Sequence, residues 1–302
     1  MSAEIRDYLA QFRGQDILYL PNPGNAGDSV MSSATYQLLD AAGARWRVPH
    51  LGTLDPAGQV ILYGGGGNLY EVGRHAYRTL ERIHARAKHL TILPHTIKDV
   101  DPLLDQFGGN VTVICREPVS YDYVRGRGGR YQTLLMPDLA FALDVERLLS
   151  GRDRFSAPLM LADFLLSKTL RRNGHTSFDN VKRYLNPGPV AARLRGRAPG
   201  GVLNCFRLDG EATDIAIPPD NIDLPIVFMY GVSPAPVAHH AARSLLSTLK
   251  SFDEIRTNRL HVAISAALVG TKTQLFANNY YKIRAIYDFS MRGRYPHVTW
   301  MG

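Results

Sequence analysis

From residue 16 onwards the chain alternates short apolar runs with amphipathic segments, and this alternation constrains the fold more than any other feature. After Asp28, apolar residues recur at helical spacing until Gly43, where a helix is expected to end. The apolar runs of strand length in the first half are 16–20, 60–63, 90–93, 111–115 and 133–136. Strands that alternate with helices predict an α/β fold with a parallel sheet covered on both faces.

The length of 302 residues exceeds the usual size of one hydrophobic core and favours two domains. After residue 200 the alternation resumes, with strands expected at 201–206, 226–230, 254–256 and 273–276 and helices at about 235–250, from 258 and from about 280. We predict a Rossmann-like domain over residues 1–144, a helical basic linker or insertion over 145–199, and a second Rossmann-like domain over 200–302. For 145–199, a lid, a membrane-facing element and a plain solvated connector all remain open.

The formal net charge of +8 favours anionic partners such as phosphorylated metabolites, acidic glycans or an anionic membrane surface. No nucleic-acid-binding motif accompanies this charge, so nucleic acid is not an expected partner. Cys115 and Cys205 each end an apolar run and are expected to be buried thiols rather than a disulfide or metal ligands. With no signal peptide and no long apolar run, we expect a cytoplasmic protein, either free or at the inner face of the membrane.

Polar and glycine-rich motifs follow the predicted strands of the first half, where open α/β sheets bind ligands. In the loop 22–28, Asp28 is expected to cap the following helix, and the loop amides are candidates for holding an anion. Four consecutive glycines at 64–67 cost more backbone entropy than a turn requires, which favours a ligand-binding loop. The candidate binding residues of this half are Asn25, Gly65, Gly66, Asn68, His95, Arg116 and Asp138.

Three of these candidates also have simpler interpretations. His95 fits a hydrogen-bonded loop histidine, and Arg116 fits a local ion pair with Glu117. Asp138 fits the cap of a following turn. Their shared position at strand ends only slightly favours a ligand site.

The second half contributes cationic and proton-transferring residues. Arg207 and Asp209 follow the strand at 201–206, either as a surface ion pair or in a cleft. Arg259 and His261 open the helix from 258. The positive charge of an Arg is unfavourable at the positive end of the helix dipole, so Arg259 is expected to face either solvent or a bound anion. His261 is the strongest acid–base candidate, although a lone helical histidine is more often a packing residue. Lys282 opens the last helix as a second anion contact or a surface lysine.

Taken in order, these motifs resemble the polysaccharide pyruvyl transferases. The resemblance runs over about residues 16–289 and rests on the segments 24–28, 64–68, 136–138, 207–211, 259–261 and 279–282. It implies two Rossmann-like domains that face each other across a cleft, similar to the GT-B glycosyltransferases. It also implies transfer of a pyruvyl group from phosphoenolpyruvate to a sugar of an exopolysaccharide or cell-surface glycan, as a cyclic ketal.

Under this resemblance, Arg207, Arg259, Lys282 and the glycine-loop amides would bind the carboxylate and phosphate of phosphoenolpyruvate. His261 would be the acid, with Asp209 or Asp28 as the base. No metal or further cofactor is required, and the acceptor glycan is either free or lipid-linked. Two alternatives remain open: a sugar-nucleotide-dependent GT-B glycosyltransferase, and a non-catalytic scaffold for glycan assembly.

Overall fold

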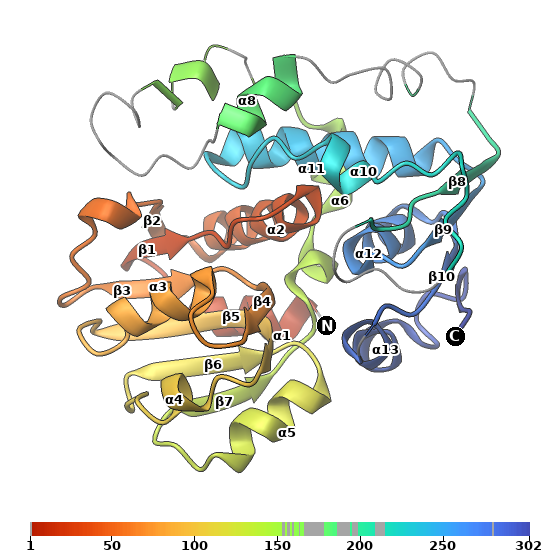
Figure 1. Ribbon diagram of the computed structural model, residues 1–302. Helices are drawn as coiled ribbons and strands as arrows, with labels where there is room; N and C mark the ends of the chain where they lie inside the picture. Colours follow the sequence, from red (N-terminus) through yellow and green to blue (C-terminus); the bar gives the residue numbers. More distant parts are fainter. Residues whose placement is uncertain are drawn as a thin grey trace. The chain divides into compact units, whose positions relative to one another are not determined.

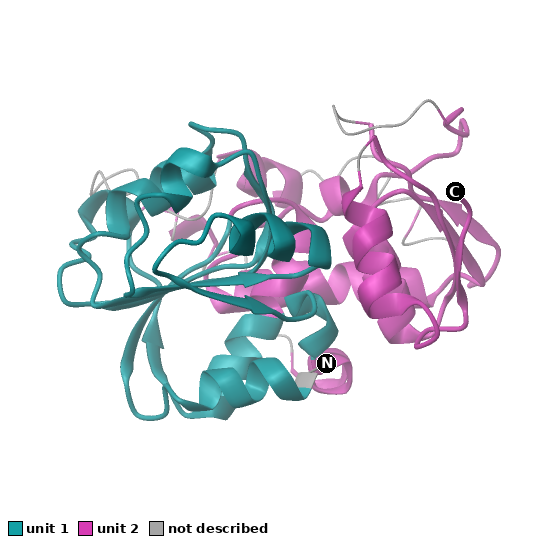
Figure 2. Ribbon diagram, turned by 90° about the horizontal axis from the view of Figure 1, so that it is seen from below, with its two compact units in different colours: residues 1–22, 34–143 teal, residues 23–33, 144–302 magenta. Residues whose placement is uncertain are grey.

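The computed structural model describes residues 2–152, 155, 158, 160–162, 164–165, 178–185, 194, 199–208, 215–279 and 281–302. The chain divides into two compact units (Figure 2). Unit 1 comprises residues 1–22 and 34–143, and unit 2 comprises residues 23–33 and 144–302. The helix after β1, α2 (Ala26–Ala42), contributes to both units, because its residues up to 33 belong to unit 2 and the rest belong to unit 1. The predicted cleft between facing domains concerns the placement of the units, and it stays a prediction.

Unit 1 contains a seven-stranded sheet in which every strand pair is parallel. Its strands are β1 (Asp16–Leu20), β2 (Arg45–Arg47), β3 (Val60–Tyr63), β4 (Gly66–Tyr70), β5 (His89–Lys98), β6 (Val111–Cys115) and β7 (Gln132–Leu135). Its helices are α1 (Ser2–Ala10), α2 (Ala26–Ala42), η1 (Leu51–Thr53), α3 (His75–Ile83), α4 (Asp101–Leu104), α5 (Pro118–Gly126) and η2 (Leu139–Ala142). Unit 1 is therefore a Rossmann-like α/β fold, as the alternation predicts.

The strand order of unit 1 is β2-β1-β3-β5-β6-β7, and β4 pairs with the C-terminal half of β5 (Figure 1). The direction of winding reverses between β1 and β3, and doubly wound sheets bind ligands where this reversal opens the carboxyl edge. The central strands β1, β3, β5 and β6 are largely buried, and they pack against helices through a cluster that includes Leu18, Ile61, Leu80, Ile92 and Val113. This core fixes the strand ends from which the candidate residues project.

Unit 2 contains a smaller parallel sheet of four strands in the order β11-β10-β9-β8. The strands are β8 (Val202–Asn204), β9 (Glu254–Thr257), β10 (Lys272–Leu275) and β11 (Val298–Trp300). The helices are α6 (Val145–Ser150), α8 (Phe178–Leu185), α10 (Leu224–Val227), α11 (Ala235–Lys250), α12 (Leu260–Val269), α13 (Lys282–Ile286) and the π-helical turn η3 (Tyr287–Met291). Helices α11, α12 and α13 connect successive strands, so this part also follows the predicted alternation.

Two expectations about local structure are wrong. The apolar run 226–230, expected as a strand, instead falls in α10 and the turn after it. Pro225 lies in the first turn of α10, where its fixed φ suits a helix start and its missing N–H would weaken a sheet. The glycine run 64–67 is only partly a loop, because β4 begins at Gly66.

Residues 145–199 belong to unit 2, and their described part includes the helices α6 and α8; their role as a linker or insertion stays a prediction. The arginines of this segment at 171, 172, 193, 195 and 197 lie outside the described residues. None of the helices in the described ranges combines the length and the apolar character that a membrane span requires.

We expect neither Cys115 nor Cys205 to react with a thiol reagent in the folded protein. Both are 0% exposed, and burial raises the pKa of each thiol, that of Cys205 to about 12. The reactive thiolate is therefore scarce at mildly alkaline pH. Titration with a chromogenic disulfide reagent should detect no thiol before urea is added and both thiols afterwards. Rapid labelling of the folded protein would contradict this burial.

Candidate functional site

A network of amide side chains lies where the carboxyl ends of β1 and β3 meet in unit 1. Asn22 Nδ2 donates to Asn68 Oδ1 at 3.0 Å, and Asn68 Nδ2 donates back to Asn22 Oδ1 at 2.9 Å. Tyr63 donates its hydroxyl proton to Asn22 Oδ1 at 3.1 Å, and His95 Nε2 is hydrogen-bonded to Asn68 Oδ1 at 3.0 Å. The structure thus brings the predicted residues Asn68 and His95 together. It adds Asn22 and Tyr63, which sequence reasoning missed.

The glycine run after β3 is explained by packing within unit 1. A Cβ on Gly64 would lie 2.6 Å from the backbone nitrogen of Asn22, and one on Gly65 would lie 2.7 Å from the carbonyl oxygen of Pro94. A Cβ on Gly66 would lie 2.2 Å from Asn22 Nδ2. These three positions exclude any side chain even without a ligand. Packing within unit 1 therefore accounts for Gly64, Gly65 and Gly66 without a ligand, and the role of Gly65 and Gly66 as ligand contacts stays a prediction.

Arg116 and Asp138 form an ion pair in the interior of unit 1. Arg116 Nη1 donates to Asp138 Oδ2 at 2.6 Å, and the side chains are 1% and 0% exposed. Arg116 Nε also donates to Thr96 Oγ1 at 2.8 Å, while Asp138 Oδ1 caps η2 by accepting from the Ala140 nitrogen at 2.9 Å. Glu117 caps α5 instead of pairing with Arg116. We therefore correct the prediction for this pair. The two buried charges neutralise each other inside unit 1, and we leave both residues out of the proposed ligand site.

In unit 2, side-chain hydrogen bonds tie together the carboxyl ends of β8 and β9. Asn258, directly after β9, accepts from the backbone nitrogen of Arg207 through Oδ1 at 2.8 Å. Thr257 Oγ1 donates to the carbonyl of Cys205 at 2.6 Å and accepts from the backbone nitrogen of Arg259 at 3.0 Å. These bonds fix the backbone positions of two predicted cationic residues at the same edge of the sheet.

Arg259 is the N-cap residue of α12 and not part of its first turn. Its side chain is ion-paired with Asp223, the residue before α10, and the two side chains are only 6% and 11% exposed. The sequence offered solvent or a bound anion as the partner of Arg259, and the structure provides a protein carboxylate. Asp223 was missed because it lies 36 residues away along the chain and ahead of a run that resembled a strand.

The start of α2 packs against His261 in the first turn of α12. A Cβ on Gly27 would lie 2.7 Å from the Cβ and 2.8 Å from the Nδ1 of His261, so only glycine permits this approach. Asn25 Oδ1 accepts from the Gly27 nitrogen and Asp28 Oδ2 accepts from the Asn25 nitrogen, both at 2.8 Å. This is a reciprocal capping box, in which Asn25 is the cap. Asp28, predicted as the N-cap, is instead the third helical residue.

Two buried amides at the same edge of unit 2 have polar atoms without a partner among the described residues. Asn258 is 0% exposed and its Nδ2 has no partner, while Asn278 is 7% exposed and neither of its amide atoms has one. A buried unsatisfied polar atom costs roughly 1–3 kcal/mol, which makes such atoms candidates for contact with water or a ligand. Both asparagines follow predicted strands, and that position was the available signal.

Two further predicted residues of unit 2 have different outcomes. Lys282 opens α13 as expected, but it is only 7% exposed, so it is not a surface lysine. Asp209 lies outside the described residues, and its role stays a prediction.

The unit 2 edge, defined by Gly27, Arg207, Asn258, Arg259, His261 and Asn278, suits an anionic ligand and a proton transfer. The positive dipole ends of α2 and α12 favour negative charge, and His261 supplies an imidazole beside them. Within the described ranges, no three His, Cys, Asp or Glu side chains gather so as to hold a metal ion.

The architecture has a counterpart among solved structures. A functionally uncharacterised protein of Klebsiella pneumoniae superposes with a TM-score of 0.74 at 22% sequence identity, and the alignment covers 100% of this chain and 98% of that one. At this identity the similarity shows the fold alone, an α/β fold of Rossmann-like type. No family model matches the chain, and no curated protein matches its sequence.

We expect Gly27→Ala to destabilise the protein. The added methyl group must displace His261 or the start of α2, and overpacking of this kind costs roughly 1–3 kcal/mol. Gly126→Ala is the matched control, because it also adds a methyl group to a helical glycine but meets nothing within 4 Å. Urea denaturation should show a lower midpoint for Gly27→Ala alone. Equal midpoints for the two variants would contradict the packing of Gly27 against His261.

We expect Asp138→Asn to lower the free energy of unfolding by about 3–5 kcal/mol, because it leaves the buried guanidinium of Arg116 without its counter-charge. Asp16→Asn removes the carboxylate of the exposed pair with Arg45 and should have no measurable effect. The same urea titration compares the two variants. A similar effect from both would show that the burial of the Arg116–Asp138 pair does not determine its contribution.

Proposed function

We propose that this protein transfers a pyruvyl group from phosphoenolpyruvate to a sugar of a bacterial exopolysaccharide or cell-surface glycan, forming a pyruvate ketal. The observation that carries the proposal is the packing of His261 against the first turn of α2. In this contact the imidazole of His261 lies beside the N-terminal ends of two helices, where a phosphate or carboxylate is favoured, and we assign this imidazole the role of proton donor. The ordered motifs shared with the polysaccharide pyruvyl transferases support the same assignment.

The donor contacts in this proposal come from the unit 2 edge and the start of α13. Phosphoenolpyruvate carries a carboxylate and a phosphate, and Arg207 and Lys282 are the cationic side chains that we assign to them. Arg259 is a third contact, oriented by its ion pair with Asp223. Because Asp223 already offsets the charge of Arg259, we expect Arg259 to contribute directional hydrogen bonds to the donor substrate more than net positive charge.

Ketal formation removes two hydroxyl protons, of which one is delivered to C3 and the other leaves on the phosphate. In the first step an acceptor hydroxyl oxygen bonds to C2 of phosphoenolpyruvate, while His261 donates a proton to the methylene carbon C3. In the second step a neighbouring hydroxyl bonds to C2, and the C–O bond to phosphate breaks with its electron pair on phosphate. Asp209 or Asp28 accepts the hydroxyl protons. The products are the cyclic ketal and inorganic phosphate.

Release of phosphate distinguishes this proposal from the two alternatives. The purified protein is incubated with phosphoenolpyruvate and a model or lipid-linked glycan, and phosphate is measured over time. Release that depends on the glycan supports pyruvyl transfer. No release with any acceptor, together with thermal stabilisation by a nucleotide sugar, would instead support a glycosyltransferase. No release and no stabilisation by either donor would favour a scaffold.

We expect His261→Ala to lower the rate of phosphate release by on the order of 10²- to 10⁴-fold, the usual contribution of a general acid. The variant should remain folded, because the half-buried imidazole is replaced by a smaller side chain that also suits a helix. His50→Ala, in a loop of unit 1, is the histidine control and should retain full activity. Unchanged kinetics of His261→Ala, with circular dichroism like that of the wild type, would refute the assignment.

A further inference from the structure

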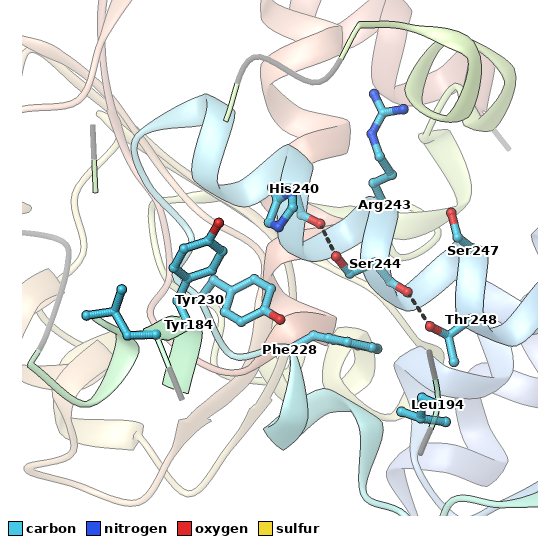
Figure 3. Close-up of a pocket in the computed structure, with 10 residues that line it drawn as sticks. Tyr184, Leu194, Phe228, Tyr230, His240, Arg243, Ser244, Ser247 and Thr248 are labelled. Carbon is cyan, nitrogen blue, oxygen red and sulfur yellow. Dashed lines mark hydrogen bonds between the residues drawn. The ribbon is translucent and has the colours of Figure 1, made fainter. Parts of the chain in front are cut away.

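Unit 2 contains a pocket of about 620 Å³ formed by α8, α11 and the segment that follows α10 (Figure 3). This volume lies in the range that holds a small molecule. Asn180 on α8 donates through Nδ2 to the carbonyl of Met229 at 2.8 Å, which ties α8 to the segment that carries Phe228 and Tyr230. This hydrogen bond therefore links two of the segments that form the pocket walls.

One wall of the pocket is aromatic, and its rings meet at steep angles. Tyr184 and Tyr230 have ring centroids 5.5 Å apart and planes at 84°. Phe228 and Tyr230 are 6.2 Å apart with planes at 62°. His240 stacks on Tyr230 at 5.5 Å and 28°, and so supports the wall from α11 (Figure 3). The rings form a corner and not two parallel faces.

The opposite wall is one polar face of α11. Ser244 Oγ donates to the carbonyl of His240 and Thr248 Oγ1 donates to the carbonyl of Ser244, both at 2.8 Å (Figure 3). Each hydroxyl has a single proton, so towards a ligand these two oxygens act as acceptors. Arg243 also lines the pocket, but its guanidinium points away from these hydroxyls and donates through Nη1 to the carbonyl of Leu149 at 2.9 Å, so it contributes positive charge at the margin (Figure 3). The residues of this face recur at helical spacing, at 240, 243, 244, 247 and 248.

The chemistry of these walls selects among classes of ligand. A quaternary ammonium ion is disfavoured, because the pocket is lined by Arg243 and, within the described residues, by no carboxylate. A phosphate or carboxylate without hydroxyl groups has no proton for the acceptor oxygens of Ser244 and Thr248. A flat nucleobase prefers parallel rings, whereas the tyrosines meet at 84°. A sugar ring presents C–H groups in several directions and hydroxyls that both donate and accept.

We infer that this pocket is a carbohydrate-binding subsite, in which a pyranose ring packs against the half-buried Tyr184, whose position the buried Tyr230 supports. The hydroxyl groups of the sugar donate to Ser244 and Thr248 on the polar face of α11. Sugar binding is inferred from the residues that line the pocket and does not depend on the proposed function. The additional role of holding the acceptor glycan for pyruvyl transfer rests on the proposed function.

Saturation-transfer difference NMR tests the subsite with the methyl glycosides of glucose, galactose, mannose and N-acetylglucosamine, each added singly and without phosphoenolpyruvate. Two variants remove the subsite by different routes: Tyr184→Ala deletes part of the half-buried aromatic corner, and Ser247→Trp fills the pocket from an exposed position. Tyr295→Ala and Ser251→Trp are the matched controls, since neither residue lines the pocket. Circular dichroism checks that each variant is folded.

We expect at least one glycoside to receive saturation from the wild type and both controls, and this signal to be lost in both pocket variants. If Tyr184→Ala proves unfolded, Ser247→Trp still decides the result. No transfer to any glycoside would overturn the inference, as would equal transfer with Ser247→Trp. Transfer to uridine but to no glycoside would show a nucleoside site and would also overturn it.

The role in pyruvyl transfer is tested separately by acceptor kinetics. Ser247→Trp should raise the KM for the glycan several-fold and leave the KM for phosphoenolpyruvate unchanged. Glycoside binding without any phosphate release would refute the proposed function and leave the subsite standing. Phosphate release with an unaltered glycan KM would refute the acceptor role alone.

Discussion

Every strand pair in the described part of both sheets is parallel, and this constraint determines where the polar residues that follow the strands gather. Parallel neighbours need a crossover, usually a helix, so each sheet has all its carboxyl ends at one edge and helix starts beside them. Residues that are far apart in sequence, such as Arg207 and Asn258, meet there because neighbouring strands end together. The position of a residue after a strand is therefore more informative than its type.

At this edge of unit 2, one position that does not tolerate a side chain is Gly27. Gly27 allows the first turn of α2 to touch His261, and the capping box of Asn25 and Asp28 holds that turn in place. The caps also explain why polar residues cluster in the loop 22–28, since buried helix starts must satisfy their N–H groups. The dipole end of α2 still favours negative charge, but the N–H groups that the capping box satisfies are not free to bind an anion.

The sequence predicted the strands and helices well where apolar periodicity is clear. The strands around 16–20, 60–63 and 111–115 and the helix 235–250 lie where expected. It failed at 226–230, because a short apolar run fits a buried strand and a buried helix equally well, and Pro225 decides between them only in context. For the site, position could be predicted but partners could not. The pairs Arg116–Asp138 and Arg259–Asp223 link segments 22 and 36 residues apart, which no local pattern reports.

The two sheet edges differ in how their polar groups are satisfied, and this difference indicates which one is suited to a ligand. In unit 1, Asn22 and Asn68 exchange hydrogen bonds, so the protein itself completes much of their hydrogen bonding. In unit 2, the Nδ2 atom of Asn258 and both amide atoms of Asn278 are buried without a partner among the described residues. Because each such atom costs roughly 1–3 kcal/mol, a ligand that supplies the missing bonds recovers free energy at the unit 2 edge. The same ligand would gain little from the paired amides of unit 1. The hydrogen bonding of buried amides thus favours unit 2 as the binding edge, independently of the charges of Arg207 and Lys282.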